Sequence, residues 1–209
     1  MNQKERITTI LSRLKKAYPV VRTQLEHTSP FELLVATILS AQCTDKQVNK
    51  VTPVLFSAMN TPEAFAKAPL SKIEKLIHST GFYHNKAKNI KNCAQALLDQ
   101  YNGVVPNALE ELIKLPGVGR KTANVVLGAA FDIPGMVVDT HVLRISQKLG
   151  FTKHKDPVRV EKDLMKIIPK KEWNDFSLWL IYLGRSLCIA RRPKCNECFL
   201  ADVCPSAQK

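Results

Sequence analysis

The stretch LPGVGRKTAN, residues 115–124, joins two segments of helical periodicity. Pro116 and Gly117 predict a tight turn, Gly119 leaves room for a close backbone approach, and a new helix is expected to begin near Arg120. Backbone amides at such a turn, together with the positive end of the following helix, form an anion site. The stretch therefore predicts a helix–hairpin–helix motif that grips phosphate without reading base sequence. The amides concerned belong to Gly117, Val118, Gly119 and Arg120.

Helix signals recur on both sides of this hairpin. Ser29 and Asp156 each precede a proline, which is typical of a cap followed by the first helical residue, and Gly103 and Gly150 stand where C-terminal caps are expected. Capping-box patterns occur at Ser29 with Glu32, Ser71 with Glu74, and Asn107 with Glu110. No sustained period of two indicates strands, so the predicted fold class is all-α. The predicted helices cover residues 30–41, 45–59, 71–79, 84–101, 107–114, 119–131, 140–149, 157–167 and 172–187.

The chain has 209 residues and is strongly basic, with 31 Lys and Arg against 18 Asp and Glu, a net charge of +13 and a pI near 9.6. Such a surplus favours a polyanionic partner, above all nucleic acid, over a basic surface kept for solubility. The N-terminal MNQKERITTILSRLKKAY predicts an amphipathic helix, and we expect no signal peptide. No apolar run approaches the roughly 20 residues of a membrane span. We therefore expect no membrane partner and a cytoplasmic protein with reduced thiols.

Four of the six cysteines lie in CIARRPKCNECFLADVC, residues 188–204. Four thiolates so close in sequence can converge on one centre, and in a reducing compartment that centre is a metal. Zinc and a [4Fe–4S] cluster both accept four thiolates, although a single CxxC between two longer arms is less typical of structural zinc. The spacing leaves both open. The predicted ligands are Cys188, Cys195, Cys198 and Cys204, whereas Cys43 and Cys93 are interpreted as ordinary partly buried thiols.

Three cations, Arg191, Arg192 and Lys194, lie between the first two of these cysteines. A loop bound to a metal has a rigid backbone, so it could present these cations to phosphates without an ordering cost at binding. The alternative is a set of solvated loop charges in a basic protein.

Lys121 occupies the first turn of the helix after the hairpin. The helix dipole disfavours a cation there by about 0.3–1 kcal/mol, and Arg120 adds like-charge repulsion, so both lower the pKa of the lysine. An amine nucleophile needs a pKa near 7–8 rather than about 10.4, a difference of about 4 kcal/mol. A partly desolvated pocket must supply the remainder. The alternative is an exposed lysine that binds phosphate.

Asp139 follows in MVVDTHV, residues 136–142, directly before another periodic segment. Its default role is a helix N-cap, and backbone N–H bonds in that role keep a carboxylate ionised and fixed. An anion so placed could stabilise an oxocarbenium-like sugar or take part in the proton transfers of Lys121. His141 could donate to a base or a phosphate, with a structural hydrogen bond at the helix start as the alternative.

Together, LPGVGRKTANVV, VDTHV and the spacing C-x6-C-x2-C-x5-C resemble the endonuclease III family of base-excision repair enzymes, in the same order and over about residues 25–204. The resemblance implies a bifunctional DNA glycosylase and abasic-site lyase with a [4Fe–4S] cluster rather than zinc. It also implies two α-helical lobes flanking a DNA-binding cleft. The six-helix lobe would cover residues 24–135, and a discontinuous cluster lobe would combine residues 1–23 and 136–209.

By the same resemblance, Lys121 is the nucleophile at C1′ of a damaged nucleotide and Asp139 is the catalytic aspartate. The nucleotide has to leave the base stack before it can be reached. Gln42 matches the residue that fills the vacated space. Phe82 falls where the family places a wedge, usually an aliphatic one, and an ordinary core aromatic is the alternative at this position.

Two other functions predict different behaviour. A monofunctional relative, such as the adenine glycosylase of mismatch repair, lacks a lysine at the position of Lys121. A DNA-binding iron–sulfur regulator would bind undamaged duplex in a salt-dependent way without cutting it. With Lys121 and Asp139 both at matching positions, the expected partner is double-stranded DNA carrying a damaged pyrimidine or an abasic site, bound by a monomer.

Overall fold

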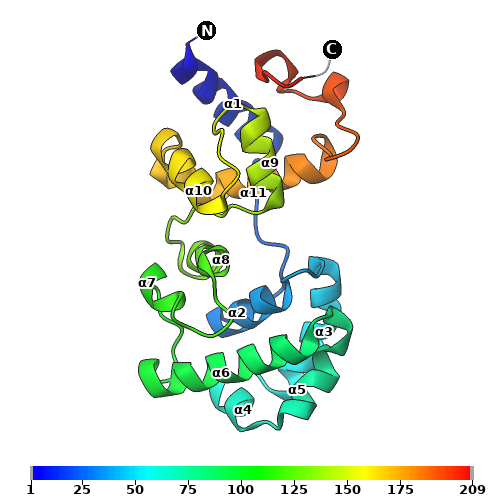
Figure 1. Ribbon diagram of the computed structural model, residues 1–209, viewed down its shortest axis with the longest axis vertical. Helices are drawn as coiled ribbons and strands as arrows, with labels where there is room; N and C mark the ends of the chain where they lie inside the picture. Colours follow the sequence, from blue (N-terminus) through cyan, green and yellow to red (C-terminus); the bar gives the residue numbers. More distant parts are fainter. Residues whose placement is uncertain (1, 208–209) are drawn as a thin grey trace. The chain divides into compact units, whose positions relative to one another are not determined.

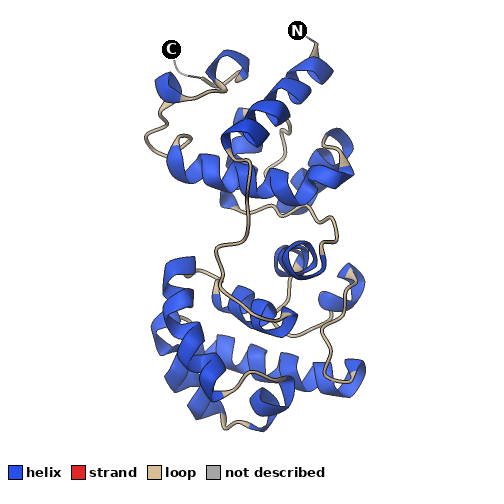
Figure 2. Ribbon diagram, turned by 180° about the vertical axis from the view of Figure 1, so that it is seen from behind, coloured by secondary structure: helices blue, strands red, loops and turns tan. Residues whose placement is uncertain are grey.

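The computed structural model describes residues 2–207, which fold almost entirely into helices. No strand occurs among these residues, as Figure 2 shows, and the predicted all-α class is confirmed. None of the helices in this range is long and apolar enough to cross a membrane. The chain divides into two compact units, each with its own hydrophobic core. Unit 1 comprises Met1–Arg22 and Pro134–Lys209, and unit 2 comprises Thr23–Ile133.

Unit 2 is built around α2, which packs against α3, α6 and α8 (Figure 1). Every residue from Phe31 to Leu39 is buried, because this helix is apolar on all sides and has no face suited to water. Its one hydroxyl in this run, Thr37 Oγ1, donates to the Leu33 carbonyl oxygen at 2.7 Å. The elements of the unit are α2 (Pro30–Leu39), α3 (Asp45–Ala58), α4 (Pro62–Lys67), α5 (Leu70–Ile77), η1 (His78–Thr80), α6 (Tyr83–Tyr101), α7 (Leu109–Leu112) and α8 (Arg120–Phe131).

The long helix α6 supports α4 and α5. Lys91 on α6 donates from Nζ to the carbonyl oxygens of Ala66 and Ala68, the latter at 2.6 Å, and so satisfies carbonyls at the C-terminal end of α4. The helix ends at Asn102 in the left-handed conformation, followed by Gly103 at φ 78°. The cap expected at Gly103 is therefore confirmed.

Unit 1 joins the N-terminal helix to the C-terminal third of the chain. The four apolar residues expected on one side of the first helix, Ile7, Ile10, Leu11 and Leu14, are buried in its core. Trp179 Nε1 donates to the Tyr18 carbonyl oxygen at 3.0 Å, which ties the chain after α1 to α11. The elements are α1 (Gln3–Ala17), α9 (Thr140–Lys148), α10 (Pro157–Ile167), η2 (Lys170–Glu172), α11 (Trp173–Ser186), η3 (Cys195–Glu197) and η4 (Ala201–Val203).

Two predicted helix starts are wrong. α5 begins at Leu70 behind Pro69, so Ser71 lies inside the helix and caps nothing. α7 begins behind Ala108 without a side-chain cap, so the expected box at Asn107 does not form. In the first case the fixed φ of proline sets the start, which a search for hydroxyl caps overlooks. The caps expected at Ser29, Asp139 and Asp156 are confirmed.

Candidate functional site

The hairpin lies in unit 2 between α7 and α8. Gly117 has φ 78°, and a Cβ at this position would lie 2.8 Å from Cβ of Asn89, so both backbone and packing require glycine. Gly119 is the N-cap of α8, is exposed, and has no atom within 4 Å of the place where a Cβ would be. No side chain caps this helix. The start of α8 is therefore accessible to an anion through its backbone.

Val118 and Arg120 differ from their glycine neighbours. Val118 is 6% exposed and belongs to the core of unit 2, so it can offer a ligand only its backbone. Its own amide donates to the Leu115 carbonyl oxygen at 3.1 Å, which closes the turn. Arg120 is half-buried at the first position of α8. The turn is thus anchored by an apolar side chain between two glycines.

Lys121 is exposed in the first turn of α8. The partly desolvated pocket expected from the sequence is therefore not formed around this lysine. The physical reason is the direction of the helix faces, because α8 buries Ala123, Asn124, Val126 and Leu127 and position 121 points away from that side.

Asp139 is the N-cap of α9, and its Oδ1 accepts a hydrogen bond from the Val142 amide at 2.8 Å. The carboxylate is half-buried. The segment that leads to it is fixed to α11, since the Val137 amide donates to Ser177 Oγ at 3.0 Å. The hydrogen bond from the Val142 amide therefore fixes the orientation of this side chain at the start of α9.

His141 is held within unit 1. Its ring packs against Gly184 of α11 so closely that a Cβ on Gly184 would lie 2.5 Å from His141 Nδ1. Nη2 of Arg144 lies 3.5 Å from the same nitrogen. These contacts support the structural alternative for His141 over contact with a base or phosphate.

The four clustered cysteines are free thiols, each half-buried, and all line one cavity with an empty volume of about 360 Å³ that is partly open to solvent. Burial raises the pKa of the Cys198 and Cys204 thiols, and the neighbouring thiols raise both further. Metal ligation requires thiolates, so a positively charged centre has to compensate the charge. The four thiols around this cavity are therefore suited to bind a metal centre.

Zinc and a cluster make different demands on these thiols. A zinc ion draws all four sulfurs to itself at about 2.3 Å. Within residues 2–207, no three or more His, Cys, Asp or Glu side chains are arranged to hold one metal ion. In a [4Fe–4S] cluster each iron takes one cysteine, so the sulfurs stand further apart. All four cysteines line the same cavity, which provides a centre of this kind with its four ligands. By contrast, burial raises the pKa of the isolated Cys93 thiol to about 12, as suits an inert core cysteine.

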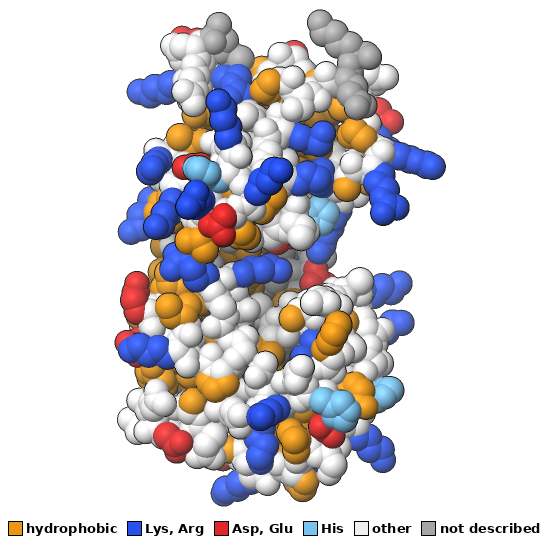
Figure 3. Space-filling model, viewed as in Figure 1, with side chains coloured by type: hydrophobic (Ala, Val, Ile, Leu, Met, Phe, Trp, Pro, Cys, Tyr) orange, Lys and Arg blue, Asp and Glu red, His pale blue; other side chains and the backbone are white. Residues whose placement is uncertain are grey.

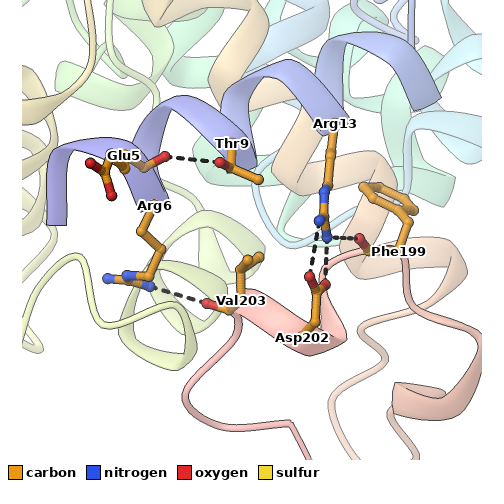
Figure 4. Close-up of polar contacts among 7 residues, drawn as sticks. All are labelled: Glu5, Arg6, Thr9, Arg13, Phe199, Asp202 and Val203. Atoms are coloured by element: carbon orange, nitrogen blue, oxygen red, sulfur yellow. Dashed lines mark hydrogen bonds and ion pairs between the residues drawn. The ribbon is translucent and has the colours of Figure 1, made fainter. Parts of the chain in front are cut away.

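The cysteine loop is fastened to α1 (Figure 4). Arg13 donates from Nη1 to the Phe199 carbonyl oxygen at 2.8 Å and forms a two-point ion pair with Asp202, whose second contact, Nη2 to Oδ2, measures 2.9 Å. Arg6 donates to the Val203 carbonyl oxygen at 3.4 Å. The Arg13 guanidinium holds the pKa of the Asp202 carboxyl below its usual value, chiefly by hydrogen bonding. The N-terminal helix therefore clamps the segment between the last two cysteines.

Gln42 and Phe82 share an unusual backbone conformation. Their φ angles are 52° and 50°, in the left-handed region, and both residues are exposed. In residues 2–207 the other non-glycine residues with positive φ, Asn102 and Asp132, are helix C-caps, where this conformation is common. Elsewhere it costs about 1–3 kcal/mol and persists mainly at functional sites. Phe82 is 63% exposed, so its interpretation as a core aromatic is wrong.

Positive charge is concentrated in unit 1. That unit carries 20 Lys and Arg against 9 Asp and Glu, a net charge of +11, whereas unit 2 carries 11 against 9, a net charge of +2. On the face drawn in Figure 3, Lys and Arg side chains crowd the surface of unit 1. Arg191 and Arg192 are exposed in the cysteine loop, and Lys194 Nζ lies 3.6 Å from Glu197 Oε2. Unit 1 is therefore the stronger electrostatic attractor for a polyanion.

The site residues predicted from the sequence are divided between the two units. Unit 2 carries Gln42, Phe82, the hairpin residues and Lys121, and unit 1 carries Asp139, His141, the four cysteines, Arg191, Arg192 and Lys194. Three side chains that organise these regions were not found from the sequence, namely Arg13, Lys86 and Arg144. No sequence signal points to Lys86, because its neighbours Asn85 and Lys88 are polar as well.

An all-helical protein with a phosphate-binding hairpin and a four-thiol loop is the class that these observations define. Residues 35–170 match the family model of the HhH-GPD superfamily base excision DNA repair protein, and residues 188–204 match the iron-sulfur binding domain of endonuclease III. The chain is 55% identical to endonuclease III of Synechocystis sp. over 208 residues, which are 99% of this chain and 95% of the relative. It is 44% identical to that of Escherichia coli over 100% of this chain and 99% of the relative.

Solved structures agree. A trapped endonuclease III–DNA covalent intermediate, the estranged-adenine complex, has a TM-score of 0.94 and 48% identity over 99% of this chain and 98% of that chain. A thermostable thymine-DNA glycosylase at 23% identity shares the fold, with a TM-score of 0.86 and 97% of each chain covered. The chain belongs to the endonuclease III family. It is a base-excision DNA glycosylase with lyase activity that acts on DNA, and it uses a [4Fe–4S] cluster.

Proposed function

We propose that this enzyme removes oxidised pyrimidines from duplex DNA and then cuts the abasic strand, with Lys121 as nucleophile and Asp139 as its carboxylate partner. The observation that carries the proposal is the place of Lys121, in the first turn of α8 directly behind the hairpin. A phosphate held by the hairpin amides brings the sugar of a neighbouring nucleotide towards that turn. A related endonuclease III has been trapped in a covalent intermediate with DNA, which supports a covalent step here.

The two compact units act, in this proposal, as the two lobes of the enzyme, and both contact the DNA. Lys121 of unit 2 and Asp139 of unit 1 then serve the same sugar. Lys121 is exposed, so its amine is accessible to a bound nucleotide.

The chemistry proceeds by displacement at C1′. The Nζ lone pair of Lys121 forms a bond to C1′ as the bond between C1′ and the base breaks, and the bonding electrons leave with the base. The carboxylate of Asp139, which accepts a hydrogen bond from the Val142 amide at 2.8 Å, stabilises positive charge that develops on the sugar. The secondary ammonium formed at Nζ then gives up a proton, which Asp139 can accept and pass to the departing base.

Strand cleavage follows from the same bond. The sugar ring opens to a Schiff base between Lys121 and C1′, which acidifies the hydrogens on C2′. Loss of one C2′ proton expels the 3′ oxygen with its phosphate by β-elimination, and the strand is cut 3′ to the lesion. Hydrolysis of the Schiff base returns the free lysine.

Eversion of the nucleotide precedes this chemistry and costs a few kcal/mol, least for a damaged base. Gln42 and Phe82, exposed in strained turns, enter the vacated space in this proposal. Arg191, Arg192 and Lys194 contact phosphates from the cysteine loop. The four cysteines at 188, 195, 198 and 204 hold the cluster, which when bound supplies the metal–thiolate bonds that fix this loop. We place the enzyme, as a monomer, on DNA in the bacterial cytoplasm.

Borohydride trapping tests this function. A duplex with a single oxidised pyrimidine is incubated with the enzyme and borohydride, which reduces a Schiff base to a stable amine. We expect a covalent adduct with the wild type, none with Lys121→Ala, and an undiminished adduct with Lys72→Ala, which removes an exposed lysine of α5. An adduct with Lys121→Ala at the wild-type level would assign the nucleophile to another amine.

A further inference from the structure

Lys86 is a buried lysine that the proposed chemistry leaves without a role. It lies in the N-terminal part of α6, is 4% exposed, and donates from Nζ to the Thr80 carbonyl oxygen at 2.8 Å. Burial lowers the pKa of this lysine. An ammonium near a helix N-terminus is disfavoured by the helix dipole and by lost hydration. Burial of this ammonium therefore costs free energy of folding, and an apolar side chain of similar size would fill the same space at a lower cost.

The ammonium of Lys86 holds the turn between η1 and α6, whose Thr80 carbonyl oxygen accepts its hydrogen bond. Thr80 is itself 2% exposed, so this contact lies inside unit 2. A second turn, residues 40–43, leads from α2 to α3, and α3 is tied to η1 through Gln47 and Ser79. Lys86 thus anchors the turn between η1 and α6 from within.

Each of these turns presents one exposed residue in the left-handed conformation. Gln42 has φ 52° and Phe82 has φ 50°. Such a conformation persists only where the surroundings fix it. The tie between α3 and η1, from Gln47 Nε2 to Ser79 Oγ at 2.8 Å, lies on the surface. The turn of Phe82 is therefore held from within by a cation, and the segment before it is tied to α3 by an external amide.

We propose that Lys86 is a positioning residue for nucleotide eversion, which fixes the turn that carries Phe82 so that its side chain enters the duplex together with that of Gln42. The inference rests on the proposed function, in which these two side chains fill the vacated space. Lys86 touches neither the substrate nor the reacting atoms. Its effect comes from preorganisation, since a displacement of about 1 Å in a supporting group can lower a rate about 100-fold.

The test removes the charge of Lys86 and keeps the approximate size of its side chain. Lys86→Met removes the ammonium from a buried site, and Lys88→Met removes one from an exposed site on the same helix. Single-turnover base release is measured on a duplex with one oxidised pyrimidine. A 2-aminopurine next to the lesion reports unstacking by its fluorescence. For Lys86→Met we expect both signals to fall about tenfold or more, while affinity for undamaged duplex stays at the wild-type level. Lys88→Met should match the wild type in both signals.

A double-mutant cycle separates positioning from general damage. If Lys86 acts through the two inserted side chains, Lys86→Met in a background of Gln42→Ala and Phe82→Ala should lower base release by less than about twofold. A full loss in that background, or an unchanged eversion signal in Lys86→Met alone, would overturn the inference. Lys86→Arg keeps a cationic donor and is expected to recover part of the eversion signal.

Two further outcomes distinguish a failure of the proposed function, on which the inference rests, from a failure of the role of Lys86. If the wild type gives no borohydride adduct, the proposed function fails. If the wild type is trapped and Lys86→Met everts normally, only the role of Lys86 fails. Should Lys86→Met not fold, Ser79→Ala removes the exposed tie instead and is expected to lower the eversion signal about threefold. An undiminished signal with Ser79→Ala then counts against the inference.

Discussion

Arg144 on α9 donates from Nη1 to the carbonyl oxygen of Cys188 at 2.8 Å, and the same nitrogen lies 3.6 Å from the Cys188 sulfur. The helix that carries Arg144 begins at Asp139. One helix therefore presents the proposed catalytic carboxylate at its N-terminus and a guanidinium to a cluster ligand about one turn later. Because a hydrogen bond to the backbone of a metal ligand fixes the orientation of that ligand, Arg144 should matter for cluster retention.

Arg144→Gln is expected to lose its cluster faster than the wild type. Partners that hydrogen-bond to metal ligands typically contribute 10–100-fold to metal affinity, so we expect release of iron to a chelator to be about tenfold faster. Release is followed by the visible absorbance of the protein and by the iron content after gel filtration. Arg159→Gln, at an exposed position in the first turn of α10, is the matched control and should release iron at the wild-type rate. Equal rates for both variants would contradict the prediction.

Asp202→Asn should weaken the clamp between α1 and the cysteine loop in a pH-dependent way. Arg13 lowers the folded-state pKa of the Asp202 carboxyl. The contribution of the ion pair to stability is therefore complete above the usual aspartate pKa of about 3.9, and it is lost as the pH falls through the lower folded value. The side chains of Arg13 and Asp202 are 36% and 64% exposed, so solvent screens the pair and we expect only a small decrease in Tm at pH 7. That decrease should vanish in strong acid.

Thermal unfolding between pH 7 and pH 3 provides the measurement. Glu26→Gln, which removes an exposed carboxylate in unit 2, controls for the change in net charge. A decrease in Tm for Asp202→Asn that persists unchanged at the lowest pH would mean that the carboxylate charge is not what stabilises the clamp.

The two glycines of the hairpin should respond oppositely to alanine. Gly117→Ala puts a methyl group 2.8 Å from Cβ of Asn89 at a φ of 78°, so we expect a loss of about 1–3 kcal/mol in the free energy of unfolding. Gly119→Ala meets open space at φ −93°, and the cost in stability should be about 1 kcal/mol or less. Its methyl group lies instead at the accessible start of α8, where it should lower DNA affinity about tenfold by keeping phosphate from the amides.

Denaturant unfolding and DNA-binding titrations on the same two variants separate these effects. The hairpin assignment predicts that Gly117→Ala loses more stability, whereas Gly119→Ala loses DNA affinity directly. If Gly119→Ala binds DNA as tightly as the wild type, the amides at the start of α8 do not hold a phosphate.

Local features of the fold followed from the sequence because their causes are local. Caps at Ser29, Asp139 and Asp156 depend on a side chain and an amide three residues later. The apolar character of α2 was enough to predict its burial. The wrong predictions also have local causes. α5 begins at Leu70 behind Pro69, one residue before Ser71, whose hydroxyl was expected to cap the helix. Spacing brought four cysteines together without deciding between two metals.

Contacts between distant residues could not be predicted in this way. Arg13 and Asp202 are 189 residues apart, and neither differs from an ordinary surface charge in the sequence. The left-handed conformations of Gln42 and Phe82 had no sequence signal, because neither position carries the glycine or asparagine that usually marks such a turn. Tertiary packing imposes both features. The ion pair and the two left-handed residues depend on the three-dimensional arrangement of the surrounding helices.

Substitution of the exposed arginines in the cysteine loop should change how DNA binding depends on salt. If Arg191 and Arg192 each neutralise one phosphate, the double alanine variant should lower the slope of log affinity against log salt by about 2. Affinity should fall equally for damaged and undamaged duplex, since phosphate contacts carry no sequence information. The matched control replaces Arg159 and Lys162 of α10, which are equally exposed in the same basic unit, and should leave the slope near its wild-type value. Equal changes in both double variants would mean that the net charge of unit 1, rather than the cysteine loop, sets the attraction for DNA.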